Sequence, residues 1–386
     1  MAITNTAEVP SGRDKMVTKI PPMVRRKLKV RAATVGMDIQ DAVSQGIEAW
    51  LSAEHPLPPV DTASSQSFST YVPADTYATF RDACANQKLP YNQGVIQAIE
   101  LWLAANPLPQ RAPRSSGARR IVFGNQKGGV GKTALTSGVG QALAEMGFTV
   151  CLVDFDPQGH LTKQLDFRHL DVDADSLVKH MVHEREVDLG KLLLRIEGDA
   201  FGDRLFLLPA CTDGFLLDAK IVTCRGLRIK ETALEQALAP LESEFDYILI
   251  DCPPSLGYAM DNALYYGRTR EGEEEGLSGL FIPVQAEDSS VDAYDLLRAQ
   301  IDSLQQDMKI LICDLGFIVN LYDSRKGFVL TSGLQYWEEM GEPPVVAVLD
   351  ELKDQREAVR MRRPLLDMHP EGEQADVMRS LARRIV

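Results

Sequence analysis

Residues 121–133 have the types and spacing of a phosphate-binding loop. The apolar run Ile121-Val122-Phe123 leads into Gly124-Asn125-Gln126-Lys127-Gly128-Gly129-Val130-Gly131-Lys132-Thr133. Glycines let the backbone approach an anion without a Cβ atom in the way, and N–H groups at a helix start then point at the phosphates. Lys132 is placed for the β- and γ-phosphates and Thr133 for a magnesium ion. The usual pattern has glycine where this chain has Gln126, and this chain adds a second lysine, Lys127.

Aspartates follow two later apolar runs. The run 149–153 leads directly into Asp154-Phe155-Asp156, and the run 245–250 ends at Asp251. Ligands bind at the carboxyl ends of strands in open α/β sheets, so these acids are candidates for the same site. We expect Asp251 to hold magnesium through water, because that ion keeps part of its hydration shell. The alternative for Asp154 and Asp156 is that they cap the next helix.

The elements around these residues predict an α/β fold, with a mostly parallel sheet flanked by helices. The loop lies between a predicted strand and a predicted helix over 134–147, which disfavours an ordinary glycine-rich turn. Further strands are predicted at 204–208, 245–250, 280–284, 315–321 and 345–349, and a further helix at 226–241. We expect an exposed acidic loop at 267–276.

The loop from Lys127 to Thr133 resembles the deviant Walker A loop of the ParA/MinD group of P-loop ATPases, and the resemblance covers about residues 118–386. It implies ATP and Mg²⁺ as cofactors and a dimer with nucleotide between the subunits, in which Lys127 reaches across. It implies that Asp156 orients the attacking water and that Asp154 helps near magnesium. The implied catalytic residues are Asp156, Lys127 and Lys132; the nucleotide contacts are Lys127, Gly128, Gly129, Val130, Gly131, Lys132, Thr133, Ala134 and Asn320; the metal ligands are Thr133, Asp154 and Asp251.

The resemblance further implies a weak ATPase, stimulated by a ParB-like or other centromere-binding protein, whose ATP-bound homodimer binds DNA and segregates a plasmid or chromosome. The family has a basic segment before its closing segment, whereas this chain has Asp350-Glu351-Leu352-Lys353 at that place. The substitutes predicted for that DNA surface are Arg325, Lys326, Arg356, Arg360 and Arg362. Two alternatives stay open: a MinD-like positioning ATPase, and a transcriptional repressor regulated by nucleotide.

Composition adds a charge asymmetry. The chain has 386 residues and a formal net charge of -14, yet residues 1–120 carry 14 Lys+Arg against 10 Asp+Glu. A basic N-terminal region followed by an acidic remainder is typical of a chain with an appended nucleic-acid-binding module. The six cysteines form no C-x-x-C pair, which argues against a disulfide framework or zinc site. No apolar run approaches the ~18 residues that span a bilayer. We expect a cytoplasmic, nucleoid-associated protein with reduced thiols.

The front third contains an internal repeat with an offset of 51 or 52 residues. Lys19-Ile20-Pro21-Pro22 matches Tyr71-Val72-Pro73-Ala74, and Glu48-Ala49-Trp50-Leu51 matches Glu100-Leu101-Trp102-Leu103. Each copy predicts a strand (16–20 and 68–72), a helix (22–34 and 73–87) and then a second helix. Asp38 is the predicted N-cap of the second helix in the first copy. This order resembles the ribbon-helix-helix DNA-binding fold, so two copies imply a single-chain pseudo-dimer.

Strand alternation turns Lys15, Val17 and Lys19 outward in the first copy and Ser67, Ser69 and Tyr71 in the second. A two-stranded ribbon is one of the elements that read DNA. The predicted DNA-binding residues here are Lys15, Lys19, Arg25, Arg26, Lys27, Lys29 and Tyr71. Arg111, Arg114, Arg119 and Arg120 could follow a DNA backbone, although most arginines in linkers are merely solvated. The alternative is a pair of helical hairpins that serve dimerisation only.

The domain boundaries follow from these observations. They are a flexible N-terminus at 1–14, a duplicated DNA-binding domain at 15–110 (repeats 15–57 and 67–109), a linker at 111–118 and an ATPase domain at 119–386. At the C-terminus an apolar stripe (Val377, Met378, Leu381, Ile385) has Arg379, Arg383 and Arg384 opposite. A membrane-surface helix could look like this. We favour packing on the domain, because the stripe is short and lacks a bulky aromatic residue.

Overall fold

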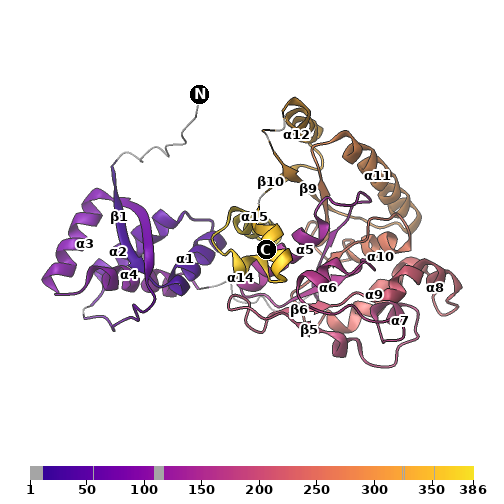
Figure 1. Cartoon of the computed structure of the whole chain (residues 1–386), viewed down its shortest axis with the longest axis horizontal. Coiled ribbons are helices and arrows are strands. Elements are labelled where there is room, and N and C mark those ends of the chain that lie inside the picture. Colours follow the sequence, from indigo (N-terminus) through magenta and orange to yellow (C-terminus); the bar gives the residue numbers. More distant parts are fainter. Residues whose placement is uncertain (1–11, 55, 108–116, 324, 326, 352) are drawn as a thin grey trace. The chain divides into compact units, whose positions relative to one another are not determined.

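The computed structural model describes residues 12–386 except 55, 108–116, 324, 326 and 352. The chain forms two compact units, Met1–Gln110 and Arg111–Val386 (Figure 1). Most of the predicted flexible segment 1–14 and of the predicted linker 111–118 lies outside the described residues. The first strand begins at Arg13, inside the predicted flexible segment.

The N-terminal unit consists of two strand-helix-helix repeats. The first is β1 (Arg13–Ile20), α1 (Pro22–Thr34) and α2 (Ile39–Ser52); the second is β2 (Gln66–Pro73), α3 (Ala74–Asn86) and α4 (Tyr91–Ala105). β1 and β2 pair antiparallel along their full length, from Arg13 opposite Pro73 to Ile20 opposite Gln66. Each strand is therefore longer than predicted, because the sequence pattern indicated only the short apolar runs at 16–20 and 68–72.

Helices α2 and α4 cross closely in the core of this unit. A Cβ atom on Gly46 would lie 2.5 Å from the carbonyl oxygen of Ala98, so only glycine permits this approach. Asp38 occupies the N-cap position of α2, as predicted, but its side chain makes no capping hydrogen bond. The start of α2 therefore lacks the predicted side-chain cap.

The C-terminal unit is an eight-stranded sheet in the order β10-β9-β8-β3-β7-β4-β6-β5, parallel except for β5. Its strands are β3 (Arg119–Phe123), β4 (Val150–Asp154), β5 (Leu194–Arg195), β6 (Leu205–Leu208), β7 (Tyr247–Asp251), β8 (Gly279–Val284), β9 (Asp314–Tyr322) and β10 (Val345–Asp350). Its α-helices are α5 (Lys132–Glu145), α6 (His160–Gln164), α7 (Leu177–Met181), α8 (Leu217–Thr223), α9 (Ala233–Leu238), α10 (Tyr258–Tyr266), α11 (Asp288–Met308), α12 (Phe328–Met340), α13 (Lys353–Met361), α14 (Leu365–Met368) and α15 (Glu373–Arg384).

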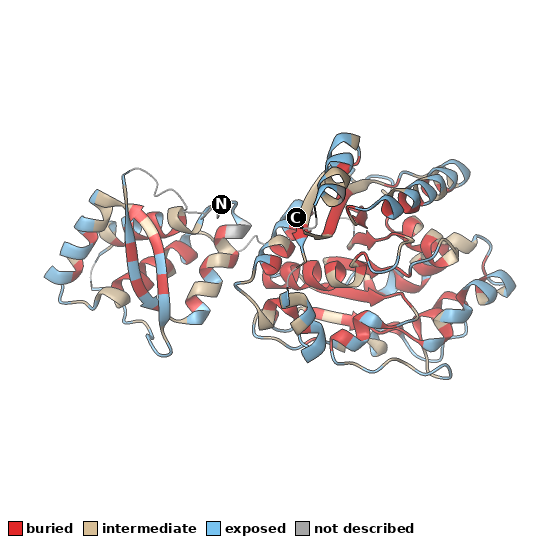
Figure 2. Ribbon diagram, turned by 45° about the horizontal axis from the view of Figure 1, so that its top comes forward, coloured by how far each residue is buried: buried red, intermediate tan, exposed pale blue. Residues whose placement is uncertain are grey.

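Helices cover both faces of this sheet, and its central strands are buried except for Arg119 at the start of β3 (Figure 2). Side chains alternate along β3: Ile121 and Phe123 pack with α5, α14 and α15, while Val122 packs with α7, α9, α10 and α11 on the other face. Strands that are buried on both faces have continuous apolar sequences, which is why these strands could be predicted from the sequence. The predicted fold class is confirmed.

The C-terminal apolar stripe packs inside the second unit. Met378, Leu381 and Ile385 are buried, and the Met378 side chain lies where a Cβ atom on Gly138 of α5 would be. The predicted packing of this stripe is confirmed. Arg379, expected on the opposite face, is instead buried, and its Nε donates to Glu145 Oε2 at 2.6 Å. No described helix combines the length and apolar character needed to cross a bilayer.

Of the four arginines that could follow a DNA backbone, Arg119 and Arg120 have structural partners instead, and Arg111 and Arg114 lie outside the described residues. Arg120 is fully buried and pairs with Glu273, with 2.9 Å between Nη1 and Oε1. Arg119 Nη1 donates to the carbonyl oxygens of Ile385 and Val386 at 2.6 and 2.8 Å. The loop 267–276 is therefore not simply an exposed acidic loop, because its Glu273 neutralises a buried arginine.

Two further expectations concern a helix and the thiols. The predicted helix at 226–241 is wrong in extent: α9 covers only Ala233–Leu238, between 3-10 turns at Lys230–Thr232 and Ala239–Leu241. Pro240 lies in the second turn and lacks an N–H for a continuing helix.

All six cysteines are free, and four of them are buried, as expected.

Candidate functional site

The predicted phosphate loop connects the end of β3 to the start of α5. Gly131, just before α5, has φ of 92°, and a Cβ atom there would lie 2.0 Å from Asn320 Nδ2. A side chain at this position is therefore excluded both by backbone conformation and by space. At Gly128 and Gly129 a Cβ atom would meet nothing within 4 Å, so the backbone there faces open space.

A pocket of about 530 Å³ lies in front of this loop. That volume suits a nucleotide-sized ligand. Among the predicted site residues, the pocket is lined by Gly128, Gly129, Gly131, Lys132, Thr133, Ala134 and Asp156. Lys127, Val130, Asp154, Asp251 and Asn320 are not in its lining. The loop and Asp156, the predicted catalytic aspartate, thus line one cavity, as the sequence predicts.

The floor of the site combines a buried lysine with a buried carboxylate. Lys132 is 6% exposed, its Nζ donates to the carbonyl oxygen of Lys127 at 3.0 Å, and burial lowers its pKa against the opposing effect of Asp251. Asp251 is fully buried, and neither of its carboxylate oxygens has a hydrogen bond of normal geometry. Burial, and then the charge of Asp154, raise the pKa of Asp251 well above its usual range, while the adjacent Thr133 and Lys132 act in the opposite direction.

These groups fit a hydrated magnesium ion. Buried carboxylate oxygens without partners are costly unless a cation or its water satisfies them. Magnesium prefers oxygen ligands and is commonly held by one or two carboxylates together with substrate phosphates. Thr133, Asp154 and Asp251 are the residues that would hold it.

Asp154 lies beside Asp251 in the sheet, because β4 and β7 pair with these two residues in register. Its Oδ2 accepts hydrogen bonds from the backbone N and the hydroxyl of Thr162 at 2.7 and 2.6 Å, whereas its Oδ1 is buried without one. Burial raises the pKa of Asp154 to about 7, although the hydrogen bonds from Thr162 act in the opposite direction.

This raised pKa predicts a pH-dependent stability. An unfolded aspartate titrates near about 3.9, so between about pH 4 and pH 7 the folded chain holds a proton that the unfolded chain has lost. The stability from this group is full below that window and is lost as the pH rises through 7. We expect the free energy of unfolding of the protein in EDTA, measured by urea titration, to fall from pH 5 to pH 8, and Asp154→Asn to flatten this fall. The exposed Asp295→Asn control should retain it; equal slopes in both variants would contradict the assignment.

Asp156 faces the pocket from the turn before α6. It is 8% exposed, and its Oδ1 accepts a hydrogen bond from the backbone N of Gln158 at 2.9 Å. This bond fixes the carboxylate at the pocket wall. A carboxylate held in this way can orient a water molecule beside the phosphate loop.

Lys127 points away from the pocket that its neighbours line. Its Nζ contacts Glu287 Oε2 at 3.0 Å, Ser289 Oγ at 2.7 Å and Ser290 Oγ at 3.1 Å, all at the start of α11. Its backbone N donates to Asn125 Oδ1 at 3.0 Å, which sets the direction of the loop. Lys127 and Lys132 therefore have separate environments, although they lie in one loop.

Asn320, at the end of β9, supports the loop. It is 6% exposed, and its Nδ2 donates to the carbonyl oxygen of Val130 at 2.9 Å. This amide braces the turn that leads into α5. Its predicted contact with the nucleotide stays a prediction, and in this structure its amide donates to the loop.

Sequence reasoning missed half of the pocket lining. Gln158, His160, Lys163 and Gln164 belong to α6 or the turn before it, and their position directly after Asp156 was a usable signal. The others are Pro254, Val359 and Arg362. Arg362, which the sequence suggested only for DNA binding, also lies 3.3 Å from Asp166 Oδ1. Nothing local in the sequence links α13 to the loop.

The basic residues predicted to bind DNA in this unit lie at the surface. Arg325 pairs with Asp323 at 2.8 Å and its side chain is 86% exposed, and Arg356 pairs with Glu351. Arg360 is exposed, and Lys326 lies outside the described residues. DNA binding by these residues stays a prediction.

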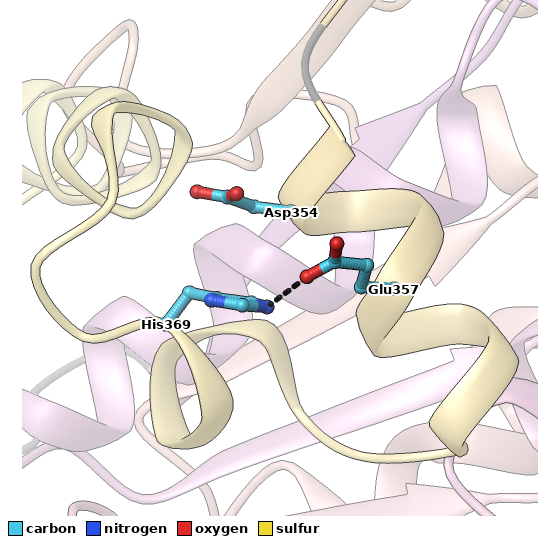
Figure 3. A group of neighbouring side chains, drawn as sticks. All are labelled: Asp354, Glu357 and His369. Carbon is cyan, nitrogen blue, oxygen red and sulfur yellow. Dashed lines mark ion pairs between the residues drawn. The ribbon is translucent and has the colours of Figure 1, made fainter.

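Asp354, Glu357 and His369 form a second cluster of titratable groups, with ligand atoms within 4.8 Å of one another. Figure 3 shows the Glu357 carboxylate pointing at the His369 ring, with 3.4 Å between Oε2 and Nε2. This ion pair joins α13 to the segment after α14. None of the three residues lines the phosphate pocket, so we assign the cluster to holding α13 in place.

Comparison with known proteins gives a consistent family. The AAA domain family matches residues 118–313. The chain is 33% identical over 222 residues to an uncharacterized protein of Mycobacterium tuberculosis (strain H37Rv), covering 56% of this chain and 63% of that protein. The match thus spans less than two thirds of that relative. The chain is 30% identical over 268 residues to the chromosome-partitioning ATPase Soj of Thermus thermophilus, covering 69% of this chain and 95% of that protein.

Solved structures agree on the fold. Cobyrinic acid a,c-diamide synthase from Mycobacterium smegmatis, with bound ATP analog and magnesium, is 28% identical with a TM-score of 0.50, over 67% of this chain and 98% of that one. Cyanothece McdA in complex with ATP is 18% identical with a TM-score of 0.57, over 69% and 95%. The latter likeness concerns the fold alone.

Proposed function

The chain belongs to the ParA/MinD-type P-loop ATPases, and from this premise we propose that it hydrolyses ATP with Mg²⁺ to drive the partition of a plasmid or chromosome. The observation that carries the proposal is the pocket that Gly128, Gly129 and residues 131–134 of the loop line together with Asp156, while the buried carboxylate of Asp251 lies beside Thr133 and Lys132. An anion-binding loop, a metal-binding acid and a water-orienting acid are the parts that phosphoryl transfer needs.

Each protein group has a separate task in this reaction. Backbone N–H groups of the loop and Lys132 bind the phosphates and stabilise the charge that develops on them. Magnesium, when bound, would offset charge on the phosphates. Thr133, Asp154 and Asp251 would hold the metal, and Asp156 orients the attacking water. Asn320 and Asn125 hold the loop in shape through Val130 and Pro283.

The ATP-bound form is a sandwich dimer to which each chain contributes Lys127. This dimer binds DNA without sequence preference through Arg325, Arg356 and Arg360. A ParB-like or other centromere-binding protein stimulates an otherwise weak hydrolysis. The N-terminal unit is a ribbon-helix-helix-like module that binds specific DNA and represses its own operon, and the protein acts on the nucleoid. The similarity to Soj supports the partition role.

A second candidate is a positioning ATPase. The chain is 30% identical over 225 residues to the cell division protein PomZ of Myxococcus xanthus, covering 58% of this chain and 64% of that protein. The partition role is favoured over a MinD-like membrane cycle, because the C-terminal apolar stripe is buried against α5.

The proposal is tested by hydrolysis and DNA co-sedimentation with the full chain. We expect slow Mg²⁺-dependent release of phosphate from ATP, and pelleting with mixed-sequence duplex DNA that needs ATP. Lys132→Ala should abolish both, whereas the exposed Lys191→Ala should retain both. Hydrolysis without any ATP-dependent DNA binding would point to the positioning role; no hydrolysis in any condition would refute the ATPase proposal.

A further inference from the structure

The N-terminal unit carries a complete two-stranded ribbon within one chain. In β1 the side chains of Lys15, Val17 and Lys19 are exposed, while Met16, Thr18 and Ile20 are buried. In β2 Ser67 and Ser69 are exposed and Tyr71 is partly exposed, while Phe68, Thr70 and Val72 are buried. The strands pair so that Lys15 lies opposite Tyr71 and Lys19 opposite Ser67. One face of the ribbon is therefore available, and it needs no second copy.

Reciprocal contacts show that the two repeats pack as the halves of an internal pseudo-dimer. Trp50 Nε1 donates to Gln97 Oε1 at 3.0 Å, and Trp102 Nε1 donates to Gln45 Oε1 at 3.2 Å. The same pair of residue types thus meets twice, once in each direction, which is the contact pattern of a twofold interface. Both tryptophans are buried, so this interface is closed within the chain.

The two halves are similar in shape but differ in charge. Helix α1 carries Arg25, Arg26, Lys27, Lys29 and Arg31 and no acid, whereas α3 carries Arg81 with Asp75 and Asp82. Arg31 points inward, because its Nη1 donates to the carbonyl oxygen of Leu103 at 3.1 Å. The outward ribbon face has the same asymmetry, with two lysines on β1 and only neutral residues on β2.

We propose that one chain of this protein, without nucleotide, recognises one asymmetric site in duplex DNA through the outer face of the β1–β2 ribbon. The proposal rests on the DNA-binding function proposed above for this unit, and it adds the stoichiometry and the symmetry of the site. The major groove admits a two-stranded ribbon, and lysine recognises the O6 and N7 atoms of guanine. Lys15 and Lys19 contact base edges or phosphates in one half of the site, and Ser67, Ser69 and Tyr71 contact the other half. Because the halves differ, the bound sequence lacks twofold symmetry.

The test uses the full chain without nucleotide and a pool of 30-base-pair duplexes with random centres. We expect repeated selection to enrich a non-palindromic sequence, and sedimentation velocity to give one chain per duplex. The double variant Lys15→Ala with Lys19→Ala should bind the enriched duplex roughly tenfold or more weakly, since each good base contact discriminates by roughly fivefold or more and this variant removes two lysines. Its affinity for mixed-sequence duplex should change less. Lys88→Ala, an exposed lysine between α3 and α4, is the matched control.

Three outcomes would overturn the proposal: enrichment of a palindrome bound by two chains, no enrichment, or unchanged affinity in the double variant. ATP hydrolysis measured on the same preparations separates this inference from the proposed ATPase function. A double variant that loses the enriched site but hydrolyses ATP at the wild-type rate supports the ribbon. Absence of hydrolysis in all preparations would refute the ATPase proposal alone.

Discussion

Replacing Lys127 with alanine is expected to abolish ATP-dependent dimerisation and to leave ATP binding to the monomer largely intact. Lys127 is absent from the pocket lining, and its ammonium group is held by Glu287, Ser289 and Ser290. Its removal therefore leaves the phosphate pocket and Lys132 unchanged. A charged group that is paired across an interface contributes about 2–5 kcal/mol, which corresponds to a loss of dimer affinity of roughly 30-fold or more.

The measurement is size-exclusion chromatography with light scattering in a non-hydrolysable ATP analogue, with nucleotide binding followed by fluorescence. Lys191→Ala serves as the control, because it removes one lysine from the surface of the same unit. If the Lys127→Ala protein dimerises as the wild type does, the interpretation of Lys127 as a residue that acts across the dimer is wrong.

Replacing Asp156 with asparagine is expected to lower turnover by about 10²–10⁴-fold while the ATP-bound dimer accumulates. Asparagine keeps an oxygen that can accept the hydrogen bond from Gln158, so the turn before α6 should be preserved. It removes the negative charge that, in the proposed reaction, orients water at the pocket wall. ATP binding, which depends on the loop and Lys132, should stay near the wild-type level.

Single-turnover hydrolysis and dimer lifetime, measured on the same preparations, check this result. Asp295→Asn, an exposed change on α11, should behave as the wild type. Unchanged turnover in Asp156→Asn would remove this residue from catalysis. A parallel loss of ATP binding would instead indicate a structural role.

Much of the fold could be predicted because its signals are local. The strands buried on both faces are continuous apolar runs, and the first repeat's helix was predicted at its observed bounds, Pro22–Thr34. The outward residues of the ribbon followed from strand alternation alone. The helix predicted at 226–241 was wrong in extent, because helix propensity does not reveal the short 3-10 turns and the proline that limit α9.

Charged residues near element ends were the least predictable. Arg120 and Glu273 look like surface charges in sequence, yet they pair inside the protein across 153 residues of chain. Arg379 shares a helix with solvent-exposed arginines and is nevertheless buried against Glu145. A charge is buried only where a partner meets it, and the partner is set by the packing of distant elements.

The sequence by itself determined the chemistry of the phosphate site: the glycines that leave backbone N–H groups open, the two lysines, and the acids at the ends of two strands. These are properties of residue type and short spacing, which sterics and hydrogen-bonding capacity dictate locally. Only the tertiary structure decided that Asp154 lies in register with Asp251, that the Lys127 ammonium group contacts Glu287 and does not line the pocket, and that Val359 of α13 lines it. Those relations depend on strand order and helix packing over long sequence separations, where many arrangements satisfy the same local pattern and the buried core selects one.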